Sequence, residues 1–128
     1  MSYLANGHLD TLPVPGDESA TVTFRSAATW ADEKRLTRRT RELSPSTEPE
    51  DRAYAFRVAR TLLMVESWTL TDALGEPLPL TPEVLESGLS RQVAAWIDKE
   101  AERRFEGRSE EDEGPFAGSS RQPSTAKT

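Results

Sequence analysis

A chain of 128 residues is long enough for one domain, and its 35% hydrophobic and 30% charged content is too polar for every segment to lie in a packed core. It contains no cysteine and one histidine, which excludes disulfides, thiolate chemistry and a histidine-rich metal site. The formal net charge of −6 argues against nucleic acid as the partner of the whole protein, because phosphate repels an acidic surface.

The composition divides the chain into a folded centre and two arms. Residues 1–19 contain Gly7, Pro13, Pro15 and Gly16 among scattered apolar residues, and we expect a flexible N-terminal arm there. Residues 107–128 are first acidic and then rich in Gly, Ser and Pro, which predicts a disordered tail. The folded domain is therefore expected over residues 20–106.

The ends of the chain also bear on its location. No apolar stretch approaches the ~20 residues that cross a bilayer. The first ten residues have neither a basic leader nor an apolar run, so no secretory signal is expected. These features predict a cytoplasmic protein with no membrane partner.

The first part of the expected domain is a strand followed by a helix. Residues 20–25 alternate and contain β-branched side chains, which is typical of a strand. Ser26 is a suitable N-cap for a helix to about residue 43, with Trp30 and Leu36 on its apolar side. Two prolines in residues 44–49 then predict a loop.

A second helix is expected over residues 51–63. Its apolar residues recur at spacings of three and four, which predicts one buried stripe containing Tyr54, Ala55, Val58, Ala59 and Leu62 and continuing to Val65, with Arg52, Arg57 and Arg60 directed elsewhere.

The pattern then changes to the period of a strand. Residues 66–71 alternate, with Trp68 and Leu70 on one face, and residues 72–75 form a turn. Residues 76–80 return as an extended arm whose two prolines allow at most an edge strand, so we expect a short β-hairpin here.

A long final helix is expected to begin at Thr81 and Pro82, a hydroxyl N-cap and a first-turn proline. Its predicted apolar side carries Leu85, Leu89, Val93, Trp96, Ile97, Ala101 and Phe105, and its polar side carries Asp98, Lys99, Glu102 and Arg103. Glu100 and Arg104 are spaced as an i,i+4 ion pair, and Gly88 predicts a bend or a close contact. The fold class is therefore mainly α within α+β: about three helices, a short β-hairpin and an N-terminal strand.

Two residues are the best candidates for acid–base chemistry, and neither is well placed for it. Glu66 lies in an apolar run, but the alternation of that run predicts an exposed position. His8 lies in the predicted arm, where nothing would hold a general base in place. No nucleophile elbow, phosphate-binding loop or zinc-protease motif occurs in the chain. We therefore expect a protein without catalytic activity, cofactor or metal.

Three groups of residues are candidates for binding other macromolecules. The last helix presents Leu89, Val93, Trp96 and Phe105, and Phe116 is a lone aromatic residue in the tail. Arg35, Arg38 and Arg39 belong to a basic cluster over residues 34–41. That cluster has three interpretations: a solvated helix face, a contact with the acidic residues 106–113 in the same or another copy, and a nucleic-acid surface.

Residues 68–85 (WTLTDALGEPLPLTPEVL) resemble small tail assembly chaperones of long-tailed, siphovirus-type bacteriophages and of prophages of actinobacteria. In that group a strand led by tryptophan, an Asp-x-x-Gly turn and a Pro-Leu-Pro-Leu-Thr arm precede a long amphipathic helix. Residues 21–25 (TVTFR) with Trp30 after them, and residues 115–119 (PFAGS), are similar to the same proteins. The resemblance covers most of residues 20–120.

This resemblance implies a non-catalytic role in the host cytoplasm during phage assembly. Proteins of the group coat the long helical tape measure protein, keep it soluble and recruit tail tube subunits. The implied partners are the tape measure protein and the major tail tube protein, with self-association as a further possibility. A small folded core with a charged tail suits reversible contacts with a long partner.

Two other functions fit the same sequence. One is a structural protein of the virion, such as a head–tail connector or a tail terminator, which would form a ring of fixed size. The other is a small nucleic-acid-binding regulator that uses residues 34–41, whose binding would depend on salt.

Overall fold

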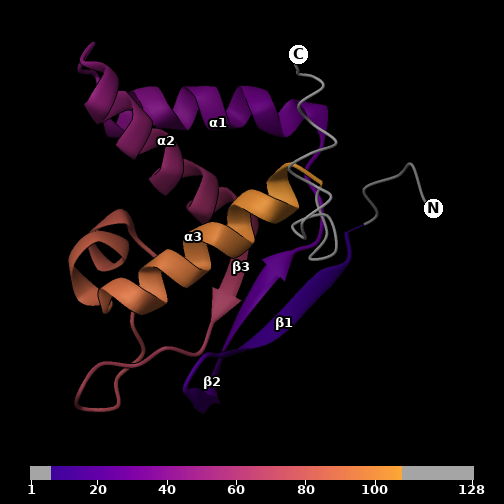
Figure 1. Cartoon of the computed structure of the whole chain (residues 1–128), viewed down its shortest axis with the longest axis vertical. Coiled ribbons are helices and arrows are strands. Elements are labelled where there is room, and N and C mark those ends of the chain that lie inside the picture. The colour runs from indigo at the N-terminus through magenta and orange to yellow at the C-terminus, as the bar shows by residue number, and fades with distance from the viewer. Residues whose placement is uncertain (1–6, 108–128) are drawn as a thin grey trace, which may run out of the picture.

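A computed structural model of the chain describes residues 7–107. The order of elements is two strands, two helices, a third strand, a short π-helical segment and a last helix. The strands form one antiparallel sheet in the order β1-β2-β3. Figure 1 shows helix α3 crossing this sheet, with helices α1 and α2 at one end of the long axis of the molecule. The predicted α+β class with three long helices is confirmed.

The sheet begins earlier in the chain than the sequence predicted. Strand β1 (Leu9–Val14) pairs along strand β2 (Asp17–Arg25), so these residues are part of the fold and not of a flexible arm. Pro15 and Gly16 connect the two strands, and Gly16 has a φ of +84°, which a Pro-Gly turn accommodates without strain. The predicted arm at residues 1–6 and most of the predicted tail, residues 108–128, lie outside the described residues.

Strand β3 (Val65–Trp68) is shorter than the predicted 66–71 and pairs with β2. The chain then turns at Asp72–Gly75, and a single bridge joins Thr71 to Pro77, so the predicted hairpin is present in a minimal form. The indole Nε1 of Trp68 donates to the carbonyl of Leu78 at 2.7 Å, which holds the returning arm against the strand.

Helix α1 (Trp30–Leu43) begins four residues later than Ser26, the predicted cap. Asp32 explains the start, because its carboxylate accepts the backbone N–H of Thr29 at 2.7 Å and so caps the first turn. Trp30 in that turn is 87% exposed, so the prediction that it lies with Leu36 on the apolar side of the helix is wrong. Helix α2 (Pro49–Met64) matches the predicted helix and begins two residues earlier, at a proline.

The predicted last helix is divided in two. Thr81 accepts the N–H of Val84, as predicted for a cap, but the segment that follows is a π-helical turn, η1 (Val84–Gly88). Helix α3 (Arg91–Phe105) then starts anew, with the Ser90 side chain accepting the N–H of Val93. The helix can begin again after the break at Gly88 because Ser90 supplies a hydroxyl that serves as a second N-cap.

The core lies between the sheet and α3. Val22, Phe24 and Ile97 are fully buried, and the rings of Phe24 and Trp96 meet edge to face with centroids 5.9 Å apart. Trp68 and Trp96 pack against this cluster as predicted. No helix in residues 7–107 has both the length and the apolar character needed to cross a membrane.

Several polar and apolar positions are the reverse of those predicted. Tyr54 is 50% exposed although the helical stripe placed it inside, while Arg60, Glu100 and Arg103 are buried. Arg60 pairs with Asp98 at 3.3 Å, and Glu100 pairs with both Arg103 and Arg104. Because each of these buried charges has an ionic partner, burial does not leave an isolated charge in the interior.

Candidate functional site

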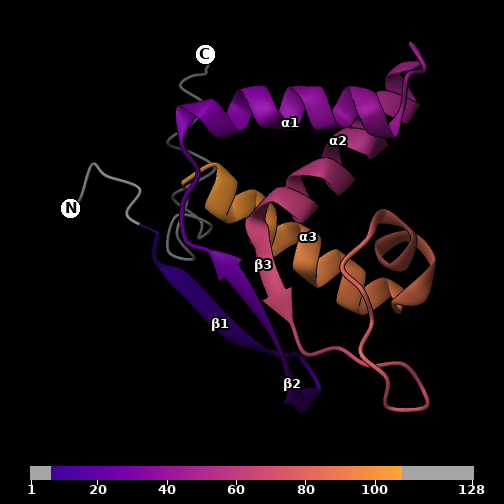
Figure 2. The same ribbon diagram turned by 180° about the vertical axis from the view of Figure 1, so that it is seen from behind.

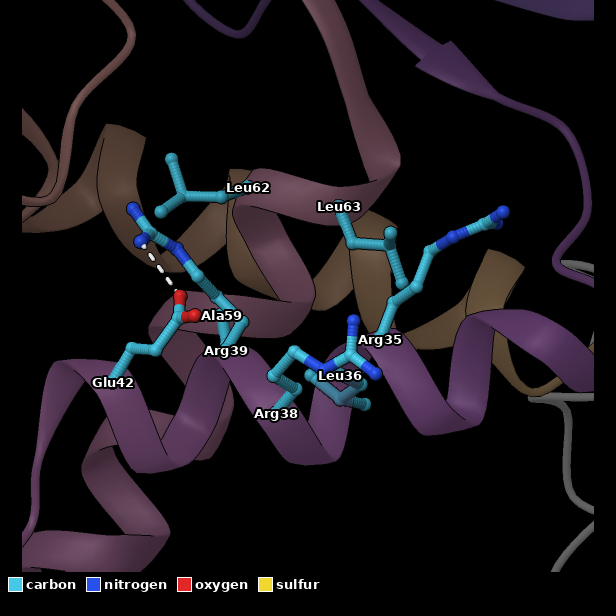
Figure 3. Close-up of a pocket in the computed structure, with 8 residues that line it drawn as sticks. All are labelled: Arg35, Leu36, Arg38, Arg39, Glu42, Ala59, Leu62 and Leu63. Carbon is cyan, nitrogen blue, oxygen red and sulfur yellow. Dashed lines mark hydrogen bonds and ion pairs between the residues drawn. The ribbon is translucent and has the colours of Figure 1, made fainter.

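The feature best suited to binding is a groove between α1 and α2 with a volume of about 300 Å³. We call it the α1–α2 groove. Helix α1 contributes Arg35, Leu36, Arg38, Arg39 and Glu42, and α2 contributes Ala59, Leu62 and Leu63. Figure 3 shows these side chains on the two helices, with the guanidinium of Arg35 directed away from Arg38 and Arg39 and a dashed line between Arg39 and Glu42.

The groove has an apolar floor and a charged rim. Leu36 and Ala59 are nearly inaccessible at 2% and 1%, and Leu62 and Leu63 are half-buried. The three arginines are exposed, and Arg39 pairs with Glu42 at 3.3 Å. Apolar burial supplies most of the affinity at such a site, and rim charges mainly set specificity and the rate of association.

A buried carboxylate fixes the position of α1 beside the groove. Asp32 is fully buried and accepts hydrogen bonds from the guanidinium groups of Arg25 and Arg35, each at 2.8 Å. Burial by itself raises the pKa of Asp32, but the hydrogen bonds from Arg25, the Thr29 backbone and Arg35 outweigh it. The net pKa of Asp32 lies well below the ordinary value of an aspartate, so the group stays ionised.

Arg25 links both helices of the groove to the sheet. Its Nη2 donates to Asp32 of α1, and its Nη1 lies 3.4 Å from the carbonyl oxygen of Leu63 at the end of α2. Arg25 itself is the last residue of β2. The two walls of the groove are therefore tied to one side chain of the sheet, which makes the groove a preformed feature.

The second buried ion cluster fastens the far end of α3. Glu100 binds Arg103 and Arg104, and the Nε of Arg104 donates to Asp10 of β1 at 3.1 Å. Burial raises the pKa of Glu100, and the hydrogen bonds from Arg103 and Arg104 more than offset that effect, so its net pKa is lowered. A carboxylate that two arginines keep ionised stabilises the fold, and it is a poor proton donor near neutral pH.

The two candidates for acid–base chemistry line one cavity of about 280 Å³ together with Arg25 and Thr29. His8 and Glu66 are both exposed to solvent, as predicted for Glu66. Exposed groups lack the desolvated setting that tunes a general acid or base. Among residues 7–107, no group of three or more His, Cys, Asp and Glu side chains is placed to hold a metal ion.

The predicted binding residues divide between the groove and the core. Arg35, Arg38 and Arg39 come together at the rim of the groove. Leu89, Val93 and Trp96 pack against the core between α3 and the sheet, Phe105 is half-buried, and Phe116 lies outside the described residues. The predicted contact surface on α3 is therefore largely used within the molecule.

Sequence reasoning did not find the floor of the groove. The period of α2 assigned Ala59 and Leu62 to a buried stripe, but it could not show that this stripe continues past the core to form one side of a groove. Only the pairing of α1 with α2 brings Leu36 opposite Leu62 and Leu63.

Comparisons with known proteins add no assignment. No protein-family model matches the chain, and searches of curated proteins and of solved structures found no match.

Proposed function

We propose that the protein is a non-catalytic tail assembly chaperone of the phage type, and that the α1–α2 groove receives a helical segment of the tape measure protein. The observation that carries this proposal is the groove itself: a preformed apolar floor bounded by three arginines. An amphipathic helix recognised in this way would place apolar residues on the floor and acidic residues beside the rim.

The chemistry of the described charged groups supports binding over catalysis. The two carboxylates with clearly shifted pKa values, Asp32 and Glu100, are both shifted downward and both satisfied by arginines. Catalytic acids and bases generally have the reverse arrangement, with a pKa moved toward neutrality in a cleft. The assignment to phage tail assembly rests on the resemblance of residues 68–85 and 21–25.

The charge balance of the rim favours an acidic peptide segment over nucleic acid. Two of the three arginines already have carboxylate partners, since Arg35 pairs with Asp32 and Arg39 with Glu42. A net charge of −6 on the whole chain further opposes a polyanion. A short acidic helix needs only a few local cations and buries apolar surface in addition.

The test is co-expression with the tape measure protein encoded in the same phage or prophage genome. We expect the tape measure protein to stay soluble and to co-purify with this chain. Arg38→Glu should reduce the recovered complex about tenfold, since reversal of a rim charge costs on the order of 1 kcal/mol or more. Trp30→Ser is the matched control, because Trp30 is exposed on α1 but does not line the groove.

Two results would overturn the proposal. One is a tape measure protein that stays insoluble and does not co-purify with the wild-type chain. The other is salt-sensitive binding of duplex DNA that Arg38→Glu abolishes, which would favour the nucleic-acid regulator instead.

A further inference from the structure

The loop between β3 and η1 contains a tight turn at residues 72–76 that carries an exposed leucine, and we call this turn the tip. The backbone N–H of Asp72 donates to the carbonyl of Glu76 at 2.8 Å, and the N–H of Gly75 donates to the carbonyl of Asp72 at 3.0 Å. Gly75 has a φ of +83°, as expected for a three-residue hairpin loop that closes with a left-handed residue. Leu74 at this tip is 86% exposed.

The side chain of Asp72 adds further order to the tip. Its Oδ1 accepts the N–H of Leu74 at 2.8 Å and the N–H of Glu76 at 3.0 Å. Residues 71–77 are all exposed, yet the backbone of the turn is held by four hydrogen bonds, two of which this carboxylate accepts. An apolar side chain presented on a preordered turn loses little conformational entropy when it binds.

The tip and the α1–α2 groove are complementary. The tip offers one large aliphatic side chain between two carboxylates, Asp72 and Glu76. The groove has a volume of about 300 Å³, and its apolar floor is bounded by Arg35, Arg38 and Arg39. Arg38 has no carboxylate partner among the ion pairs of the described residues, so it is available to a carboxylate from outside.

The two surfaces cannot meet within one molecule. Figures 1 and 2 show, in opposite views, helix α1 at one end of the long axis and the loop after β3 at the other end. A contact between them must therefore join two copies of the chain. Because it uses a different surface on each copy, it is heterologous and propagates from copy to copy into a ring or a filament.

We infer that the protein assembles head to tail, with Leu74 of one copy inserted in the α1–α2 groove of the next copy and the carboxylates of Asp72 and Glu76 facing its arginines. The inference does not rest on the function proposed above. A partner helix and the hairpin of another copy would compete for the groove, so the assembly is tested with this chain alone.

The primary test is sedimentation velocity of the full-length chain over a concentration series up to about 1 mM, a range that covers weak contacts. We expect the weight-average sedimentation coefficient of the wild type to rise with concentration. Leu74→Ser should lower the association constant about tenfold or more, since it removes the apolar anchor. Trp30→Ser removes an equally exposed apolar side chain away from both surfaces and should leave the association unchanged.

A mixing experiment identifies the head-to-tail geometry. Leu74→Ser keeps an intact groove, and Arg38→Glu keeps an intact tip, so each variant alone should associate weakly. A one-to-one mixture retains one good groove and one good tip, and it should form dimers and nothing larger. The charge swap that combines Arg38→Glu with Glu76→Arg in one chain should restore at least part of the assembly, as a double-mutant cycle requires of an interacting pair.

Three results would overturn the inference. The first is a wild-type chain that stays monomeric over the whole concentration range. The second is a Leu74→Ser variant that associates like the wild type. The third is a mixture of the two variants that associates no better than either variant alone. Circular dichroism of each variant confirms that the exposed substitutions leave the fold intact.

Discussion

Asp32→Asn tests the tie between α1 and the sheet most directly. The change keeps the size of the side chain but removes the charge and turns one acceptor oxygen into a donor. In the native chain that carboxylate binds Arg25, Arg35 and the backbone N–H of Thr29. The amide group of an asparagine faces at least one of these donors with a donor of its own, so at least one hydrogen bond of the buried site is lost and is not replaced.

The cost follows from the exposure of each partner. The Asp32 side chain is 0% exposed, whereas that of Arg25 is 28% exposed, so the loss of this pair costs on the order of 2 kcal/mol. Arg35 is 63% exposed and regains water, so its pair adds only a few tenths of a kcal/mol. The remaining oxygen of the asparagine can still accept the N–H of Thr29 and keep the helix cap, so the expected destabilisation is about 2 kcal/mol.

Urea unfolding followed by far-UV circular dichroism measures this loss. In thermal unfolding followed by the same signal, the midpoint should fall by about 10 °C. Glu42→Gln is the matched control, because its ion pair with Arg39 lies on the same helix and is exposed on both sides. We expect that control to cost less than about 0.5 kcal/mol. A loss for Asp32→Asn no larger than that of the control would refute the reasoning.

The same variant should change the response to acid. The pKa of Asp32 is lowered in the folded chain from an ordinary value of 3.8, so the unfolded chain takes up this proton first as the pH falls. The stabilisation is therefore fully present above about pH 5 and is lost progressively on acidification below about pH 4. The difference in stability between the wild type and Asp32→Asn should narrow over that range. A gap that stays constant from pH 7 to pH 3 would contradict the assignment.

Three further predictions concern α3 and the tryptophans. Glu100→Gln should lower the free energy of unfolding by about 2 kcal/mol in urea, because two arginines lose a buried counter-charge; a change under about 0.5 kcal/mol would contradict this role. Ser90→Ala should cost about 1 kcal/mol in thermal melts while Ser90→Asp, which keeps a capping oxygen, should not. Trp30→Phe should remove most of the fluorescence that acrylamide quenches efficiently, since Trp30 is 87% exposed and the other two tryptophans are packed; unchanged quenching would place Trp30 inside.

Local patterns were sufficient for much of the secondary structure. The spacing of apolar residues and the proline at its start defined α2, and the alternation of β-branched residues defined most of β2. Thr81 was identified as a cap from its hydroxyl and the proline after it. These features depend on backbone sterics and on neighbours within about four residues, which a sequence displays directly.

Some errors came from signals that were present but were outweighed. Residues 9–14 are followed by Pro15-Gly16, which is a turn signal, yet the glycines and prolines of residues 1–19 favoured an arm. Trp30 was assigned to the apolar side of the predicted helix together with Leu36. The structure places Trp30 at the first position of α1, where its side chain is 87% exposed.

The sequence by itself determined that the chain is a small α+β domain, with one apolar stripe on α2 and a basic segment on α1. Only the tertiary structure decided that the arginines of that segment rim a groove floored by α2, and that Arg60, Glu100 and Arg103 are buried. The physical reason is that burial depends on which elements pack together. Glu100 pairs with Arg103 and Arg104 of its own helix, but the ion pairs that join α3 to α2 and to the sheet connect residues far apart in the chain. Arg104 meets Asp10 across 94 positions and Arg57 meets Asp98 across 41, separations that no local periodicity encodes.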